Sequence, residues 1–476
     1  MIKYILVAIL LLIAIILIRT YLFKPKPTQE REIEEISFDE KKAIDNLGKL
    51  VRCKTISYFD HSLEDDKEFD KLVNMLPKLY PLVFKNLDLK KFPGRALLFH
   101  WKGKGKGQPA VFMAHYDVVP VDENNWSKPA FEGLIKNNIM WGRGTLDTKV
   151  TFNGILSAAE NLLKQKFKPE NDIYFAFSGG EEVNGPGAEN IVKYFKKKNI
   201  TPSFVLDEGG AVVSDVFPGV NKPCGLVGIA EKGYINMTLS VESSGGHASA
   251  PKPHTPVGVL ASSVSKIESH PFPIHFSKPV TLMFDELGRH STFLYRMIFA
   301  NLWCFGWILD LICRKQGGQL NALIRTTCAF TQAKGSNAAN VIPPSASVTA
   351  NIRLNPKDSV SKATKYISKV INNKDIKISL SDPSEPSRIS TTECDGYKYI
   401  TNAIEDTWKG CITAPYLMVQ CSDSRSYGII SDRVYRFSAT DLTKQEMDSI
   451  HGNDEHIRLQ TIKRSVEFFI RVMKNC

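Results

Sequence analysis

The residues of this chain that could do chemistry are acidic side chains and histidines that follow short apolar runs. The run at 110–115 ends in His115, and Asp117 follows two residues later. Residues two apart in an extended chain face the same side, so the carboxylate of Asp117 can hold the imidazole of His115 in the tautomer that binds a metal. A His-x-Asp triplet is common by itself, so this pair acquires meaning only together with the residues that follow it.

Later stretches add more acids and a second histidine in a definite order. Asp147 closes the stretch Trp-Gly-Arg-Gly-Thr-Leu-Asp, just before a helical pattern. The acids and the histidine that follow it are Glu181, Glu182, Asp207 and His451. Adjacent carboxylates repel one another unless something cationic holds them. Each of these motifs is weak alone, but the ordered set predicts a shared site on loops that follow apolar strands.

The elements that must position these residues alternate between strand and helix. Apolar runs at 110–115, 173–178 and 204–207 are typical of buried strands, and 148–165 and 187–198 are typical of helices. This alternation predicts an α/β fold with a mostly parallel sheet covered by helices.

A second kind of sequence interrupts the first. Strands with alternating polarity are predicted at 234–242 and 346–354, with a helix near 257–269 between them. They indicate an α+β domain of the lid or dimerisation type, inserted into the catalytic domain. The predicted boundaries are 37–233 and 376–476 for the catalytic domain and 234–375 for the insert.

The insert contains an unusually apolar stretch at 293–313, within a longer insertion near 276–326. Its nearly unbroken apolar part is too short to span a bilayer. Three interpretations stay open: a buried helix, a lid or lining for an apolar substrate, and a surface that dips into the membrane.

The first residues form a membrane-targeting segment, because 4–18 carry no charge. We expect residues 1–23 to be an uncleaved transmembrane signal anchor rather than a removed signal peptide, followed by a polar linker at 24–36. The cations after the apolar segment favour a cytosolic body. Three glycosylation triplets, at Asn125, Asn199 and Asn236, favour the opposite side and a glycoprotein.

On balance we expect a protein anchored in a membrane of the secretory pathway, with its body on the lumenal, vacuolar or lysosomal, or extracellular face. The protein would be secreted if the helix is cleaved.

Composition excludes several classes of protein. The 476 residues suffice for a large core, and nine cysteines are too few for a disulfide framework. The 61 basic residues exceed the 50 acidic ones, which suits anionic substrates or acidic surfaces. Zinc-finger spacing, basic heptads and ribonucleoprotein motifs are all missing from the sequence, so we expect no nucleic-acid partner.

The ordered set of acids and histidines resembles the di-zinc aminoacylase and carboxypeptidase family of metallopeptidases, over nearly the whole chain after the anchor. Within that family it is most similar to the branch containing carboxypeptidase S and the N-fatty-acyl-amino acid synthase/hydrolase. The resemblance implies two zinc ions per chain, with Glu181 as general base and Asp117 orienting a histidine. The five implied ligands are His115 and Asp207 at one zinc, Glu182 and His451 at the other, and Asp147 between them.

The charges agree with that assignment, because three carboxylates and two neutral imidazoles leave two Zn²⁺ ions with a net positive charge. The resemblance extends to the insert. It implies that His247, in a Ser-Gly-Gly-His loop, stabilises the developing oxyanion from outside the zinc domain. It also implies that Asn340, Arg353 and Arg425 help to bind the substrate's carboxylate.

The sequence departs from the family pattern near the site. A His-Asp pair is expected where Gly179 and Gly180 stand, and a second acid is expected at Thr148. None of the three is an implied metal ligand, so the departures bear on substrate preference and on tuning of the site.

These features predict a di-zinc amidohydrolase that hydrolyses N-acyl amino acids with long acyl chains, with the reverse synthesis open to the same site. A carboxypeptidase acting on short peptides with a free C-terminus is the alternative, and a non-catalytic binding protein is the more distant one. The substrate is expected to be a small molecule, and a homodimer is left open.

Overall fold

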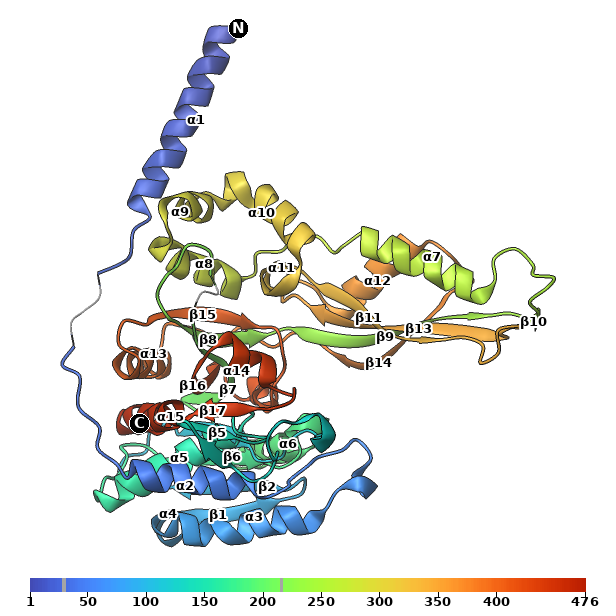
Figure 1. Ribbon diagram of the computed structural model, residues 1–476. Coiled ribbons are helices and arrows are strands. Elements are labelled where there is room, and N and C mark those ends of the chain that lie inside the picture. The colour runs from blue at the N-terminus through green and yellow to red at the C-terminus, as the bar shows by residue number, and fades with distance from the viewer. Residues whose placement is uncertain (28–30, 215–216) are drawn as a thin grey trace.

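The computed structural model describes residues 1–27, 31–214 and 217–476. Within them lie a large sheet covered by helices, a second sheet that extends away from it, a group of apolar helices and a projecting N-terminal helix (Figure 1). The α/β architecture with a separate α+β part confirms the predicted fold class.

The large sheet has eight strands in the order β1-β2-β6-β3-β7-β16-β8-β15. The pairs β6–β3, β3–β7, β7–β16 and β8–β15 are parallel, and the antiparallel pairs include β1–β2 and β2–β6 at one edge. Its strands are β1 (Asp88–Phe92), β2 (Ala96–Trp101), β3 (Ala110–His115), β6 (Ile173–Ser178), β7 (Phe204–Val213), β8 (Cys224–Glu231), β15 (Ile412–Met418) and β16 (Val434–Leu442). The predicted runs at 110–115, 173–178 and 204–207 therefore form three neighbouring strands.

Alternating side chains bury both faces of this sheet. In β3, Phe112 packs with the helices on one face and Val111 with those on the other. The first face is covered by α2 (Glu40–Val51), α3 (Asp66–Leu79), α4 (Pro81–Asn86), α5 (Lys149–Lys164), α13 (Asp395–Thr407) and α15 (Leu459–Lys474). The second is covered by α6 (Gly187–Lys197) and the short helix η4 (Asp423–Ile429).

A small sheet lies beside the loop that carries Asp147. It has the order β17-β5-β4, with β4 (Leu134–Lys136), β5 (Ile139–Trp141) and β17 (His456–Arg458). The pairing of His456 with Trp141 brings the late segment containing His451 close to the glycine-rich loop that follows β5. The remaining short elements are η1 (His61–Leu63), η2 (Glu123–Asn125), η3 (Glu181–Val183) and α14 (Lys444–Ser449).

The inserted domain is a four-stranded antiparallel sheet in the order β11-β13-β9-β14, backed by two helices. Its elements are β9 (Gly233–Glu242), α7 (Pro256–Ser269), β11 (Thr327–Lys334), β13 (Ser345–Leu354), α12 (Val360–Ile371) and β14 (Lys377–Ser384), with β10 (Gly246–His247) pairing β12 (Val341–Ile342) near one end. The predicted boundary at 375 is wrong, because β14 pairs with β9 and extends the inserted domain to Ser384.

The apolar insertion near 276–326 does not pack on the inserted sheet. Its helices are α8 (Lys278–His290), α9 (Phe293–Ala300), α10 (Leu302–Gln316) and α11 (Gly318–Ile324). Phe284 and Phe299 share a core with Ile412 and Leu417 of β15 in the large sheet. In three dimensions this insertion therefore belongs with the catalytic sheet, although in sequence it interrupts the insert.

The N-terminal helix α1 (Ile2–Leu22) is long and apolar enough to cross a membrane. After it, the described linker residues 24–27 and 31–36 contain no helix or strand, and 28–30 lie outside the described residues. Arg31 forms ion pairs with Glu405 at 2.9 Å and Asp406 at 3.1 Å, so the later part of the linker follows the body.

Two of the three glycosylation triplets lie at the surface. Asn125 and Asn199 are exposed. Asn236 instead lies in β9, where its Oδ1 accepts a hydrogen bond from Nδ2 of Asn351 at 2.8 Å.

Candidate metal centre

His115 ends β3 and is buried with its ring between acidic groups. Its Nδ1 faces the main-chain oxygen of Asp117 at 3.1 Å and the Asp117 carboxylate at 3.4 Å. A proton on Nδ1 satisfies both contacts and leaves Nε2 as the atom available to a metal. The predicted orienting role of Asp117 agrees with this geometry.

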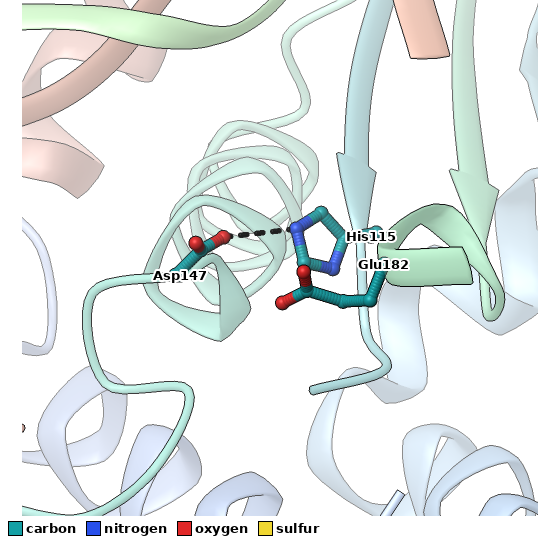
Figure 2. A group of neighbouring side chains, drawn as sticks. All are labelled: His115, Asp147 and Glu182. Atoms are coloured by element: carbon teal, nitrogen blue, oxygen red, sulfur yellow. Dashed lines mark hydrogen bonds and ion pairs between the residues drawn. The ribbon is translucent and has the colours of Figure 1, made fainter. Parts of the chain in front are cut away.

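The carboxylate of Asp147 lies between the two histidines of the cluster. Its Oδ1 is 3.0 Å from Nε2 of His115, and its Oδ2 is 3.0 Å from Nε2 of His451. Figure 2 shows Asp147 reaching toward His115 from the loop that precedes a helix, with Glu182 beside them. One carboxylate that offers a different oxygen to each of two histidines is the geometry expected of a ligand shared by two metal ions.

Glu181 and Glu182 lie in η3, directly after the end of β6. Their main-chain N–H groups each donate to the carboxylate of Asp117, both at 3.2 Å. Oε2 of Glu182 is 3.1 Å from Nε2 of His451. Oε1 of Glu182 is buried without a hydrogen-bond partner among the residues that the structure describes. Asp117 therefore positions both the histidine and the pair of glutamates.

One predicted ligand lies apart from the other predicted ligands. Glu208, and not Asp207, lies in the cluster, with Oε1 3.4 Å from Nε2 of His115. Asp207 is buried and instead accepts a hydrogen bond from the main-chain N–H of Ser424 at 3.0 Å. Neighbouring strand residues face opposite sides, and the pairing of β7 with β16 is irregular after Asp207, where Gly209 has a φ of +139°.

Two triads in the described residues could hold a metal ion. His115, Asp147 and Glu182 form one, and His115, Glu181 and Glu208 form the other. With His451, which contacts both Asp147 and Glu182, they make up one connected cluster, which we call the acid–histidine cluster.

The electrostatics of the acid–histidine cluster fit a bound cation. Burial raises the pKa of Glu181 well above its usual range, and burial together with Asp147 raises that of Glu182 to about 7. Burial alone would raise the pKa of Asp147, but hydrogen bonds to His115 and His451 hold it below its usual value. So many buried acids at one point are costly to ionise unless positive charge joins them. The orphaned oxygen of Glu182 is a further sign that a ligand belongs there.

Two residues outside the predicted set hold the loop of Asp147 in place. Oε1 of Glu455 accepts from the N–H of Leu146 at 2.7 Å, and its Oε2 accepts from Arg143 at 2.6 Å. Both side chains are buried. Glu455 comes four residues after His451, so one short segment carries a cluster histidine and braces the loop opposite it. The spacing from His451 is the only sequence signal for this role.

Two predicted carboxylate-binding residues come together beside the domain boundary. The guanidinium groups of Arg353 and Arg425 each lie 5.6 Å from the ring centre of Tyr234. Arg353 also donates to Sγ of Cys421 at 3.6 Å. Cys421 lines the same cavity as the acid–histidine cluster. The two arginines therefore place positive charge near that cavity.

The other two predicted residues of the insert lie elsewhere. His247 is in β10 and Asn340 directly precedes β12, so they are neighbours, and Asn340 accepts a hydrogen bond from the N–H of Ala248 at 2.9 Å. Figure 1 shows β10 at the far end of the inserted sheet. Neither residue lines the cavity of the acid–histidine cluster, because the inserted sheet extends away from it. In this conformation, His247 does not reach the site.

A cavity of about 1740 Å³ opens over the cluster. Asp147, Glu181, Glu182, Glu208 and His451 line it, and one wall is apolar, formed by Leu226, Tyr416 and Met418. The described residues of 297–309 do not line it. The stretch therefore does not line this cavity, because Phe299 packs into the core and Trp303 and Trp307 are exposed.

The departures from the family pattern have local explanations. A side chain at Gly179 would meet the ring of Tyr116 at 2.7 Å, so Tyr116 fills the space that a histidine at position 179 would need. A Cβ at Gly180 would meet only Gly185, at 3.7 Å. Thr148 is buried and donates to Thr151 at the start of α5, in place of an acid.

The sheet, the strand-end acids and the paired histidines together define a metallopeptidase. The chain belongs to peptidase family M20/M25/M40, whose family model matches residues 111–475, and it is an enzyme of the metallopeptidase and amidohydrolase type.

Two named relatives cover nearly the whole chain. Probable carboxypeptidase S-like 2 of Dictyostelium discoideum is 38% identical over 437 residues, which are 90% of this chain and 84% of that protein. N-fatty-acyl-amino acid synthase/hydrolase PM20D1 of Xenopus tropicalis is 34% identical over 486 residues, which are 99% of this chain and 94% of that protein. These names agree with the branch that the sequence resembles.

Solved structures share the fold at low identity. An M20 family metallo-carboxypeptidase from Sulfolobus solfataricus aligns with a TM-score of 0.65 at 17% identity, over 91% of this chain and 98% of that one. Human carnosine dipeptidase 1 aligns with a TM-score of 0.63 at 14% identity, over 92% and 96%.

Proposed function

We propose that this enzyme hydrolyses the amide bond between an acyl group and an amino acid that bears a free carboxylate, with two zinc ions per chain. The observation that carries the proposal is the position of Asp147, which offers one oxygen to each histidine of the acid–histidine cluster. Glu182 and His451 would hold one zinc ion and His115 and Glu208 the other, with Asp147 shared. When bound, zinc acts as a Lewis acid toward the carbonyl and makes water more acidic.

In this proposal, Glu181 is the general base. Its carboxylate takes a proton from the attacking water while the water oxygen bonds to the carbonyl carbon. When the C–N bond breaks, the same carboxyl group returns that proton to the leaving nitrogen. Run in reverse, these transfers condense an acid with an amine, which is how one site serves both hydrolysis and synthesis. Burial, which raises the pKa of Glu181, suits a group that must both take and give a proton.

Long acyl chains are the substrates we favour. The cavity over the acid–histidine cluster is also lined by Leu226, Tyr416 and Met418, which offer apolar surface to an alkyl chain. Arg353 and Arg425 supply positive charge for the carboxylate of the amino acid. The similarity to the Xenopus tropicalis synthase/hydrolase over 99% of the chain supports the same substrate class.

Cleavage of short peptides from a free C-terminus is the second candidate. The similarity to a probable carboxypeptidase S-like protein supports it, and the two arginines would serve it equally well. A competition assay of the full chain in detergent separates the two, with long-chain N-acyl amino acids against N-blocked dipeptides. We expect kcat/KM to rise with acyl length, because each buried methylene contributes about 0.8 kcal/mol. Preference for the dipeptides would overturn the proposal in favour of a carboxypeptidase.

We further propose that α1 anchors the enzyme in a membrane of the secretory pathway. The length and apolar character of α1 support an anchor. For catalysis, the reacting carbonyl would meet His247 either after the inserted domain moves or from a second copy of the chain.

A further inference from the structure

Helices α9 and α10 carry a concentration of exposed apolar side chains. The two helices meet at an angle of 112°. Trp303 and Trp307 are 59% and 64% exposed, although tryptophan is usually buried in a soluble fold. We call this surface the α9–α10 face; its exposed residues are Phe293, Leu294, Tyr295, Trp303, Trp307, Leu311 and Ile312. An apolar patch of this kind marks a contact with another molecule or with lipid.

The junction of α9 and α10 lies against the membrane-spanning candidate α1. Nη2 of Arg19 donates to the main-chain oxygen of Ala300 at 3.0 Å, and its Nε donates to Oδ1 of Asn301 at 3.2 Å. Nδ2 of Asn301 in turn faces the main-chain oxygen of Ile16 and Oγ1 of Thr20, both at 3.3 Å. Asn301 and Thr20 are both buried in this contact. Arg19, the cation in the last turn of α1, therefore finds its partners at the junction of α9 and α10.

The depth of this contact along α1 places it at a membrane surface. A helix rises about 1.5 Å per residue, so Ile16 lies about 21 Å from the start of α1. That is the last third of a hydrocarbon layer about 30 Å thick. Polar side chains at that depth are costly unless they pair with one another, as Arg19 and Asn301 do.

Contacts below this level fix the orientation of α1 further. Nη1 of Arg289 donates to the main-chain oxygen of Lys24 at 3.1 Å. Lys26 lies 3.6 Å from Glu286. Figure 1 shows α1 rising from the edge of the body where α9 and α10 form the outermost layer. A bilayer crossed by α1 would therefore lie directly on the α9–α10 face.

We propose that the α9–α10 face inserts into the interfacial layer of the bilayer that α1 spans, with Arg19 and Asn301 setting its depth. Tryptophan favours the membrane interface, and a bent pair of short helices can lie in the plane of the surface without spanning it. The enzyme would then be held by two elements and lie flat on the membrane. This inference rests on the proposed anchor but is independent of the proposed reaction.

The test uses the full chain in phosphatidylcholine vesicles that contain brominated phosphatidylcholine, which quenches nearby tryptophan fluorescence. The chain has six tryptophans, and the other four, Trp101, Trp126, Trp141 and Trp408, lie in the body. We expect bromines near the headgroups to quench the wild type strongly and bromines near the bilayer centre to quench it weakly. A Trp303→Phe/Trp307→Phe variant should lose this quenching, whereas Trp101→Phe, in the buried core of the body, should keep it.

Several outcomes would overturn the proposal. Wild-type emission that is insensitive to bromolipid, in protein that floats with the vesicles, would mean that the face is solvated or covered by a second copy. Protein that does not float with the vesicles would contradict both the anchor and the face. Asn301→Leu should weaken the shallow quenching if Asn301 sets the depth. Turnover of a short, water-soluble acetyl-amino acid should be the same in all variants, which separates this test from that of the reaction.

Discussion

The rim of the large sheet carries the acid–histidine cluster, and the far end of the inserted sheet carries His247. The polar residues of these two regions lie in opposite environments. At the rim, acids from β7, η3 and the loop before α5 converge on His115, with oxygens 3.0 to 4.0 Å from its Nε2, buried and crowded with like charge. At the far end, His247 and Asn340 lie side by side where the short strands β10 and β12 pair, and both are exposed. The rim residues are in place before substrate binds, whereas His247 must be brought to the acid–histidine cluster.

A single sheet can bring together residues from distant parts of a chain. The carboxyl ends of parallel strands lie at one edge of the sheet. Residues that follow these strands therefore come close together, however far apart they are in sequence. A residue on an inserted domain meets that edge only through domain movement or a second subunit. Substitutions of the proposed metal ligands at the rim should therefore act on metal binding and chemistry together, and substitutions at the far end on chemistry alone.

The largest effect is expected at Glu181. Glu181→Gln should retain metal but lower kcat by about 10²-fold to 10⁴-fold, the usual cost of losing a general base. Steady-state kinetics with elemental analysis measures both. Glu182→Gln is the matched control, because it should lose metal instead. Near-normal turnover in a metal-replete Glu181→Gln enzyme would remove Glu181 from the mechanism.

The next largest effect is expected at His247, at the far end of the inserted sheet. His247→Ala should lower kcat by about 10²-fold to 10³-fold if its imidazole stabilises the oxyanion, with metal content and Tm unchanged because the side chain is exposed.

A mixing experiment then decides how His247 reaches the site. If it acts in a second copy, mixing His247→Ala with Glu181→Gln chains should restore about one quarter of the sites in a random dimer. No recovery in verified mixed dimers would favour movement of the inserted domain within one chain.

Glu208 and Asp207 offer a matched pair at the rim. Glu208→Gln should lower the affinity for one of the metal ions by more than about 10-fold to 100-fold, the range typical of losing a residue that only supports a ligand. Asp207→Asn should keep both metals, since its carboxylate is paired with the N–H of Ser424. Titration with a competing chelator measures the affinities. The reverse ranking would restore Asp207 as the ligand.

The smallest effect is expected at Arg425. Arg425→Ala should lower kcat/KM roughly 30-fold for a substrate with a free carboxylate, which corresponds to about 2 kcal/mol of lost transition-state stabilisation. It should change kcat/KM little for the amidated analogue. Measuring both substrates with one enzyme preparation checks this. Equal losses on both would mean that Arg425 only supports the loop that it shares with Ser424.

The sequence alone predicts the rim better than it predicts the insert. The runs before His115 and Glu181 are continuous and apolar, so their strands and the convergence of their ends could be foreseen. The choice between Asp207 and Glu208 could not, because it depends on the irregular pairing of β7 with β16. The packing of α9 and α10 on the large sheet was equally hidden, since an apolar pattern does not say which surface it covers.

The role of Glu455 shows the same limit. From the sequence alone, an acid close to His451 could equally be a ligand. Only the contacts with Leu146 and Arg143 show that Glu455 braces the loop of Asp147. Sequence patterns thus predict where the site forms, and tertiary contacts determine the role of each acidic residue in it.

The sharing of Asp147 between two metal ions can be tested by elemental analysis of the full-length protein purified in detergent. The wild type should carry two zinc ions per chain, and Asp147→Ala should retain neither while the fold persists by circular dichroism. Thr148→Ala, one residue away, should retain both. One zinc ion in the wild type, or two in Asp147→Ala, would contradict the shared carboxylate and the mechanism built on it.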